Sequence, residues 1–241
     1  MVGRLLARGM VAGIVAALLT FVFAKLFGEP QVALAIAFES AQDAAAGIAP
    51  EPELVSRSVQ ASYGLLTAVL MYGAAYGGAF AIVFALAYKR LNLSSPRVLA
   101  LLLAGVGFLT FVLIPDLKYP PNPPAVGLEE TIGLRTAMYF AMVGIAIAIS
   151  MISLLVGRAL VASLGRWNAA LCGIALGLAL VVLAQFGLPD STEVPGNFPA
   201  IVLWRFRKAA IGMQLVMWSS LGLVFGALAE KLLQSPRAQA R

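Results

Sequence analysis

Charged side chains of opposite sign gather in three polar loops, where they could pair with one another or attract cations. Five basic residues precede apolar runs: Arg57, Arg135, Arg205, Arg207 and Lys208. The same loops contain acids: Glu51, Glu53, Asp116, Glu129, Glu130, Asp190 and Glu193. A cation near the start of a helix is disfavoured by ~0.3–1 kcal/mol because the helix dipole is positive there, so we expect nearby carboxylates to compensate.

Two kinds of site follow from this pattern. In the first, Arg–carboxylate pairs latch the loops together. This structural latch would use Arg57, Arg135, Arg205 and Arg207, with Glu53 among the acids. In the second, the acids form a vestibule that collects ions.

Six long apolar runs must position these loops. They are Met10–Phe27, Tyr63–Tyr88, Val98–Ile114, Thr136–Val156, Ala169–Leu188 and Ala209–Leu233. Each run is long enough to cross a hydrocarbon core of about 30 Å as a helix. The chain is 61% hydrophobic and 12% charged, and its mean hydropathy is +0.93. The sequence therefore predicts an all-α integral membrane protein with six transmembrane helices.

The charges between the runs predict the orientation. Basic residues dominate the N-terminus, the second and fourth loops and the C-terminus, where Glu230 is the single acid. Every other Asp and Glu lies in the first, third and fifth loops. Lys and Arg concentrate on the cytoplasmic side of a bilayer. We therefore expect both termini in the cytoplasm and the acid-containing loops outside.

The outer loops resemble one another, which predicts three out-and-back helical hairpins in parallel repeat. Pro30, Pro115 and Pro189 each lie beside an acid, where we expect proline to end the outgoing helix. The hairpins span about 5–90, 97–158 and 167–234 of a single membrane domain, 1–241. Alternatively, Pro, Asn and acids recur only because they suit loops. A helix lying on the membrane surface is also expected at Gln31–Ala46.

Small residues at four-residue spacing predict how the helices pack. The pairs are Gly9/Gly13, Gly73/Gly77, Ala137/Ala141, Gly173/Gly177 and Gly222/Gly226. Such pairs allow close approach of helices where lipid removes the hydrophobic driving force. The third run offers only Ala100/Ala104, so we expect it to lie peripherally or against a partner.

Several classes of protein are disfavoured. The chain contains no histidine, and no run has an ionisable residue near its middle. We find no base for a Ser or Cys nucleophile and no cluster with zinc spacing, so we do not expect an enzyme or a bound cofactor. The net charge of +6 reflects cytoplasmic Lys and Arg. Nucleic-acid binding is not expected, because it needs a basic face exposed to water.

Several segments along nearly the whole chain resemble the probable cobalt transporter subunit family, CbtA. They are Met1–Met10, Phe27–Gln31, Ala35–Glu39, Glu53–Arg57, Lys118–Gly127, Thr131–Thr136, Pro195–Ala200 and Leu203–Arg207. The Lys118–Gly127 motif is the most distinctive of these. The resemblance implies a multi-pass protein of the bacterial cytoplasmic (inner) membrane that takes part in cobalt uptake.

The resemblance also implies a partner, whereas the expected ligand set follows from the residues of this chain. The usual partner is CbtB, a small single-span subunit with histidines in its tail. Co²⁺ accepts oxygen or imidazole ligands, and this chain lacks imidazole. The expected ligands at the outer mouth are therefore Asp116, Glu129, Glu130 and Asp190, with carbonyls from Asn122 and Asn197.

Two functions remain open at this stage. One is a permease-like subunit of a divalent cation uptake system with Co²⁺ as its cargo. It would work in the lipid bilayer with CbtB, other membrane subunits or further copies of itself. The other is a scaffold or accessory subunit of a larger membrane complex that transports nothing itself.

Overall fold

The computed structural model describes residues 2–49, 53–90, 95–190 and 193–234, which form helices and loops and contain no strand. The helices are α1 (Val2–Phe23), α2 (Glu29–Ala45), α3 (Arg57–Val59), α4 (Leu65–Tyr88), α5 (Pro96–Phe108), α6 (Ile114–Lys118), α7 (Ile132–Gly187) and α8 (Ala200–Leu233). Three π-helical turns link some of them: η1 (Ala24–Gly28), η2 (Gln60–Gly64) and η3 (Leu109–Leu113). A 3₁₀ turn, η4 (Glu129–Thr131), precedes α7. The all-helical prediction is confirmed.

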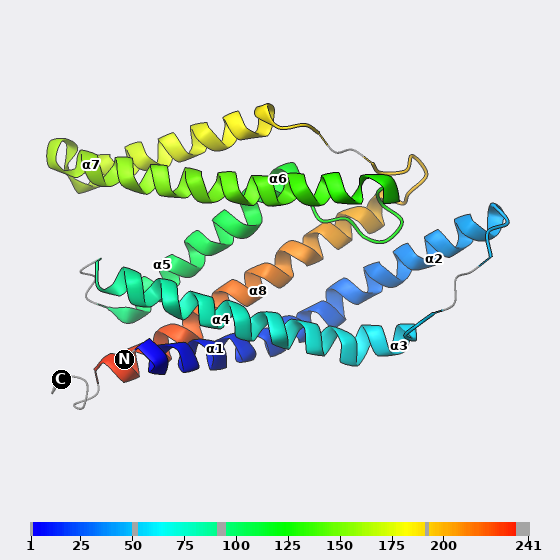
Figure 1. Cartoon of the computed structure of the whole chain (residues 1–241), viewed down its shortest axis with the longest axis horizontal. Coiled ribbons are helices and arrows are strands. Elements are labelled where there is room, and N and C mark those ends of the chain that lie inside the picture. The colour runs from blue at the N-terminus through cyan, green and yellow to red at the C-terminus, as the bar shows by residue number, and fades with distance from the viewer. Residues whose placement is uncertain (1, 50–52, 91–94, 191–192, 235–241) are drawn as a thin grey trace. The chain divides into compact units, whose positions relative to one another are not determined.

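Within the described residues, five continuous helical stretches are long and apolar enough to cross a membrane. They are Val2–Ala45, Arg57–Tyr88, Pro96–Lys118, Ile132–Gly187 and Ala200–Leu233. The fourth contains two of the six expected runs, because α7 is broken at Gly165, where φ is 74° and ψ is 166°. The chain reverses direction there, so α7 has two limbs (Figure 1). Six crossings, the parallel repeat and the orientation of the termini stay predictions.

The described chain packs as two units. Unit 1 comprises the described residues within 1–107, 123–125 and 199–241, and unit 2 comprises those within 108–122 and 126–198. The boundary at Gly107 divides the expected second hairpin: α5 packs in unit 1, and η3 with α6 packs in unit 2. The single-domain prediction stays untested.

In unit 1, α1 and α4 lie side by side and are nearly in backbone contact (Figure 1). A Cβ added to Gly9 would lie 2.2 Å from the Gly77 carbonyl oxygen. A Cβ added to Gly13 would lie 1.9 Å from the Gly73 carbonyl oxygen. The pairing of Gly9 with Gly77 and of Gly13 with Gly73 makes the helices antiparallel. The packing predicted for these two glycine pairs is confirmed.

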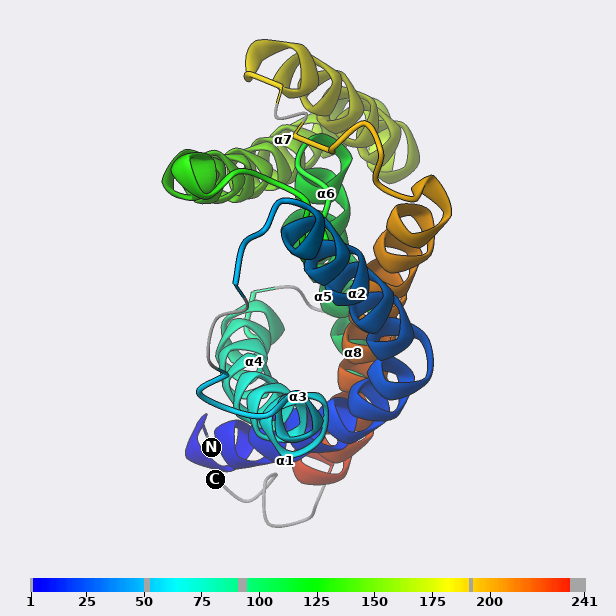
Figure 2. The same ribbon diagram turned by 90° about the vertical axis from the view of Figure 1, so that its right-hand side faces the viewer.

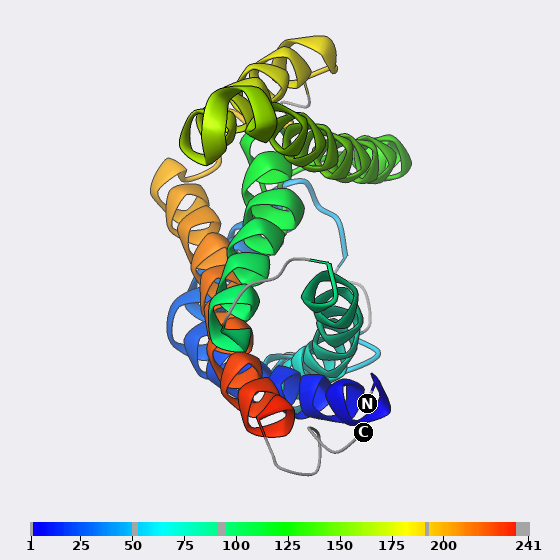
Figure 3. The same cartoon turned by 90° about the vertical axis from the view of Figure 1, so that its left-hand side faces the viewer.

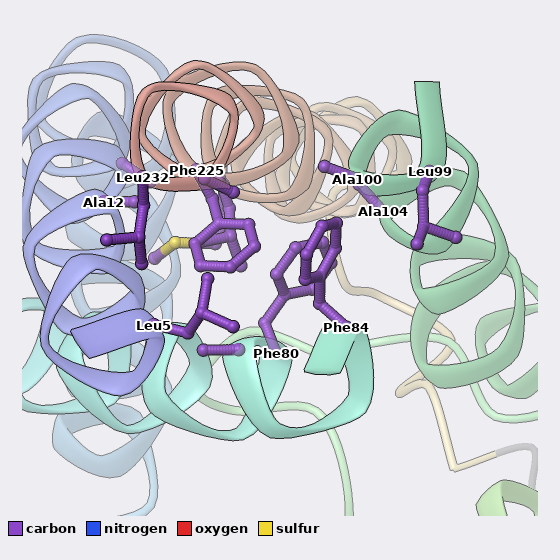
Figure 4. Close-up of a cluster of buried hydrophobic side chains, with 14 of the residues drawn as sticks. Leu5, Ala12, Phe80, Phe84, Leu99, Ala100, Ala104, Phe225 and Leu232 are labelled. Atoms are coloured by element: carbon purple, nitrogen blue, oxygen red, sulfur yellow. The ribbon is translucent and has the colours of Figure 1, made fainter. Parts of the chain in front are cut away.

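The rest of unit 1 is built around α8. The end of α8 lies beside the start of α1 (Figure 3), and Phe225 of α8 meets Phe80 and Phe84 of α4 at ring-centroid distances of 5.4 and 5.0 Å (Figure 4). On α5, Ala100 and Ala104 are buried, and a Cβ on Gly222 would lie 2.7 Å from that of Ala104. One face of α5 thus packs on α8, while Leu102 and Val106 remain exposed, so the peripheral position of the third run stays a prediction. Two alanines suffice for close packing when the facing helix supplies glycine.

Pro30 and Pro115 do not end their helices, contrary to expectation. Each lies in the first turn of a helix that directly follows a π-helical turn, η1 or η3. In each π turn the last N–H bonds five residues back, as Glu29 does to the Ala24 carbonyl. We attribute the continuation to this wider turn, because proline in a regular helix clashes with the carbonyl four residues earlier. Consequently α2 continues from α1 (Figure 2).

Pro189 is the proline that behaves as expected. Helix α7 ends at Gly187, and Leu188 is extended with ψ of 149°. A residue before proline avoids the helical region because of a steric clash with the proline ring. No π turn precedes this proline in the described chain, so the helix stops.

Unit 2 is held by close contacts between the limbs of α7 and η3. A Cβ on Gly173 would lie 2.8 Å from the Ser153 carbonyl oxygen, and one on Gly177 would lie 2.7 Å from Ser153 Oγ. Thr110 Oγ1 of η3 lies 2.7 Å from Ser150 Oγ. The predicted packing of Gly173/Gly177 is confirmed.

Candidate functional site

In unit 1, the loop arginine Arg57 is compensated by two acids. Its Nη2 lies 2.6 Å from Oε2 of Glu29, the first residue of α2. Glu53 instead accepts the Arg57 backbone N–H, at 3.3 Å. At the same end, Lys25 Nζ donates to the Ala61 carbonyl at 2.9 Å and so links η1 to η2. Arg57 is thus paired, but its guanidinium partner is Glu29 rather than Glu53.

In unit 2, Glu193 joins the third and fifth loops. Its Oε2 accepts the Leu128 N–H at 2.9 Å and the Thr131 hydroxyl at 2.7 Å. Arg135 Nε lies 3.2 Å away, but it is not aligned for a hydrogen bond. The bonds from Leu128 and Thr131, followed by the charge of Arg135, lower the pKa of Glu193 from its usual 4.5. The carboxylate therefore holds the two loops together in its ionised form.

Gly127 makes room for the arginine of this cluster. Its φ is +114°, and a Cβ there would lie 2.0 Å from Arg135 Nη1. Only glycine combines that backbone conformation with a guanidinium packed directly on it. Arg135 Nη2 donates to the Leu128 carbonyl at 3.0 Å. The loop folds around Arg135, which lies in the first turn of α7.

The second link in unit 2 is a buried lysine. The Lys118 side chain is 7% exposed. Its ammonium lies 2.5 Å from Asp190 Oδ1 and donates to the Gln185 carbonyl at 2.7 Å. Gln185 lies in the last turn of α7, where the helix dipole favours a cation. The neighbouring Tyr119 hydroxyl donates to the Pro189 carbonyl at 2.8 Å, so two successive side chains anchor the third loop to the fifth.

At the other end of unit 1, two arginines converge on the C-terminal part of α8. Arg8 Nη1 donates to the Leu228 carbonyl, and Arg97 Nε lies 2.6 Å from Glu230 Oε2. The contacts join α1 and α5 to α8. Glu230, the single acid expected among the cytoplasmic charges, is therefore paired.

The remaining predicted residues differ in their exposure. Asp116 and Asn122 are half-buried, and Glu130 and Asn197 are exposed; the Glu129 side chain and Glu51 lie outside the described residues. The described residues contain no group of three or more His, Cys, Asp or Glu able to hold a metal ion. The ligand set at the outer mouth stays a prediction.

The cations of α8 do not lie at a helix start. Helix α8 begins at Ala200, well before the expected Ala209, so Arg205, Arg207 and Lys208 lie beyond its first turn. The unfavourable dipole decays over that first turn. Arg205 is exposed and Arg207 half-buried, while Lys208 Nζ lies 5.3 Å from the centre of the Trp204 ring. For Lys208, this cation–π contact with Trp204 takes the place of the expected carboxylate.

Sequence reasoning overlooked two residues of these clusters. The sequence predicts that the first outgoing helix ends at Glu29, because Pro30 follows it. Lys118 was part of a family motif and had no assigned role. Its signal was a lone lysine between Asp116 and Tyr119 at the end of an apolar run, where a buried cation needs a partner.

The long apolar helices and polar loops define a multi-pass helical membrane protein. Comparison with known families then identifies it more closely. Residues 2–230 match the family described as "Probable cobalt transporter subunit (CbtA)", so the chain belongs to the CbtA family. No curated protein and no solved structure matches it.

Proposed function

We propose that the chain is the permease-like membrane subunit of a divalent cation uptake system, and that Co²⁺ is its cargo. The match to the cobalt transporter subunit family over residues 2–230 carries this proposal. The protein crosses the bacterial cytoplasmic membrane six times, with both termini inside. The one-sided distribution of Lys and Arg in the loops supports this orientation.

In this proposal the outer loops attract and pass on the cation. The candidate ligands are Glu129, Glu130, Asp116 and Asp190, with Asn122 and Asn197 supplying carbonyls. The membrane potential contributes about 2.3 kcal/mol per charge per 100 mV to inward movement. Arg135–Glu193 shapes the loops that carry these ligands in unit 2, because the pair joins segments distant in sequence.

The proposal includes a partner. Co²⁺ uses imidazole as well as oxygen ligands, and this chain has no histidine. A small single-span subunit with histidines, of the CbtB kind, would complete the ligand set. Other membrane subunits or further copies of this chain could complete the complex.

Radioactive cobalt uptake tests the proposal in cells without their own cobalt importers. The chain is expressed alone and with the histidine-bearing subunit. The double variant Glu129→Gln/Glu130→Gln is expected to lower uptake at normal membrane insertion. Glu39→Gln/Asp43→Asn is the matched control, because it removes the same charge from α2. Equal uptake by both double variants and the wild type would exclude Glu129 and Glu130 from the mouth.

A scaffold without transport activity is the second candidate. It is favoured by the interior of unit 1, where Phe84, Phe225 and Leu5 are fully buried and pack in one apolar cluster. Such a core supports helices but offers a cation no ligand. Absence of uptake in every combination, despite correct insertion, would favour the scaffold.

A further inference from the structure

The buried ammonium of Lys118 already occupies a place built for a cation. It is surrounded by the Asp190 carboxylate at 2.5 Å and the Gln185 carbonyl at 2.7 Å. The carbonyl belongs to the last turn of α7, where the helix dipole is negative. Three features thus attract positive charge to one point: a carboxylate, a carbonyl oxygen and a helix C-terminus.

This arrangement is costly for a contact that only joins two loops. Removing an ammonium from water costs free energy that pairing with an exposed carboxylate returns only in part. Tyr119 makes a link beside it with an uncharged hydroxyl. Lys118 therefore brings a charge that anchoring alone does not require.

Asp190 remains open to solvent while it binds the lysine. Its side chain is 85% exposed, in contrast to the 7% exposure of Lys118. A cation from solution can therefore reach the carboxylate, while the ammonium stands against the Gln185 carbonyl. The ammonium is carried on a flexible stem of four carbons, so it can withdraw without unfolding the loop.

We propose that Asp190 and the Gln185 carbonyl form a divalent cation site that Lys118 closes, so that the ammonium and the incoming ion compete for it. The proposal rests on the proposed function, since it adds a gate to one of the suggested mouth ligands. Carboxylate and carbonyl oxygens suit a hard or borderline divalent ion, and water completes its coordination. Competition keeps the site weak, as a site of passage must be.

Cobalt binding to the purified full chain tests this gate without any transport step. CoCl₂ is titrated calorimetrically into the wild type and Lys118→Met in lipid nanodiscs. The apparent affinity for Co²⁺ decreases when a smaller fraction of the protein has the site open. If the ammonium closes the site most of the time, Lys118→Met binds Co²⁺ about tenfold tighter or more. Lys118→Arg retains the charge and is expected to stay close to the wild type.

Two further variants locate the effect. Asp190→Asn added to Lys118→Met is expected to abolish the gain, because it removes the carboxylate. Lys208→Met is the matched control: it removes a lysine that contacts the Trp204 ring instead of a carboxylate, so it is expected to leave affinity unchanged. Thermal unfolding of each variant checks folding, and Lys118→Gln replaces Lys118→Met if the latter unfolds.

The gate is refuted if Lys118→Met binds no tighter than the wild type, if the gain survives Asp190→Asn, or if Lys208→Met shows the same gain. These outcomes are independent of uptake. A gain in binding together with no cobalt uptake in cells would refute the permease and leave the cation site standing.

Discussion

The contact between α1 and α4 makes the most direct physical prediction. In Gly13→Ala the new Cβ would lie 1.9 Å from the Gly73 carbonyl oxygen, whereas ordinary contact begins at 3.4 Å. The helices must separate locally by about 1.5 Å, and the obstructing atoms are backbone, which cannot rotate away. Overpacking of this kind costs about 1–3 kcal/mol. Because the obstructing atoms are backbone, we expect the upper part of this range, about 2–3 kcal/mol. Alanine returns up to ~1 kcal/mol through its helix propensity, which leaves a net destabilisation of about 1–2 kcal/mol or more.

Gly144→Ala provides the matched control. Gly144 lies within α7, and a Cβ there meets nothing within 4 Å. This variant gains helix propensity without a clash, so it is expected to be as stable as the wild type or up to ~1 kcal/mol more stable.

Reversible unfolding of the purified protein in mixed micelles measures both variants against the wild type. The expected result is a clear loss of stability in Gly13→Ala alone. If Gly13→Ala were as stable as Gly144→Ala, the α1–α4 backbone contact would be refuted as a source of stability.

Three further predictions concern Glu193, Glu230 and Gly165. The Leu128 N–H stabilises the ionised form of Glu193, so the contribution of this carboxylate to folding stability is full above pH 4.5 and disappears as pH falls through its lowered pKa. The stability advantage of the wild type over Glu193→Gln should therefore shrink in that acidic range. A difference in melting temperature that stays constant with pH would contradict this. Glu230→Gln leaves Arg97 without its carboxylate, and the charge-reversed pair Arg97→Glu/Glu230→Arg should recover part of any lost stability in the same assay; no recovery would mean that the ion pair contributes nothing. In Gly165→Ala the new Cβ meets no neighbour, but the backbone conformation there favours glycine. The free energy of unfolding should therefore fall by about 1–3 kcal/mol from backbone strain alone. Unchanged stability would contradict the positive φ at this turn.

The prolines show where local reasoning failed. Pro30, Pro115 and Pro189 look equivalent in sequence, since each follows an apolar run and lies beside an acid. The chain stays helical through Pro30 and Pro115, each after a π turn, whereas helix α7 ends before Pro189. Hydrogen bonds five residues apart are weakly encoded in sequence and depend on what packs around the turn.

The ion pairs show a similar division. Sequence reasoning expected the cations Arg57 and Arg135 to be compensated, because each lies near a helix start. The choice of partner could not be predicted: Glu29 is far from Arg57 in sequence, and Glu193 is farther from Arg135. Many acids were available in the loops, and only the folded chain brings one of them within reach.

Properties that depend on neighbouring residues can be inferred from the sequence alone. The apolar runs specified helices long enough for a membrane, because that requires only length and hydrophobicity. The glycines at four-residue spacing specified where helices could approach closely. Properties that depend on distant segments emerge only in the folded chain: the pairing of Gly13 with Gly73, the burial of Lys118 against Asp190, and the close packing of the two limbs of α7. A side chain's type is local, but its partner is decided by how the whole chain packs.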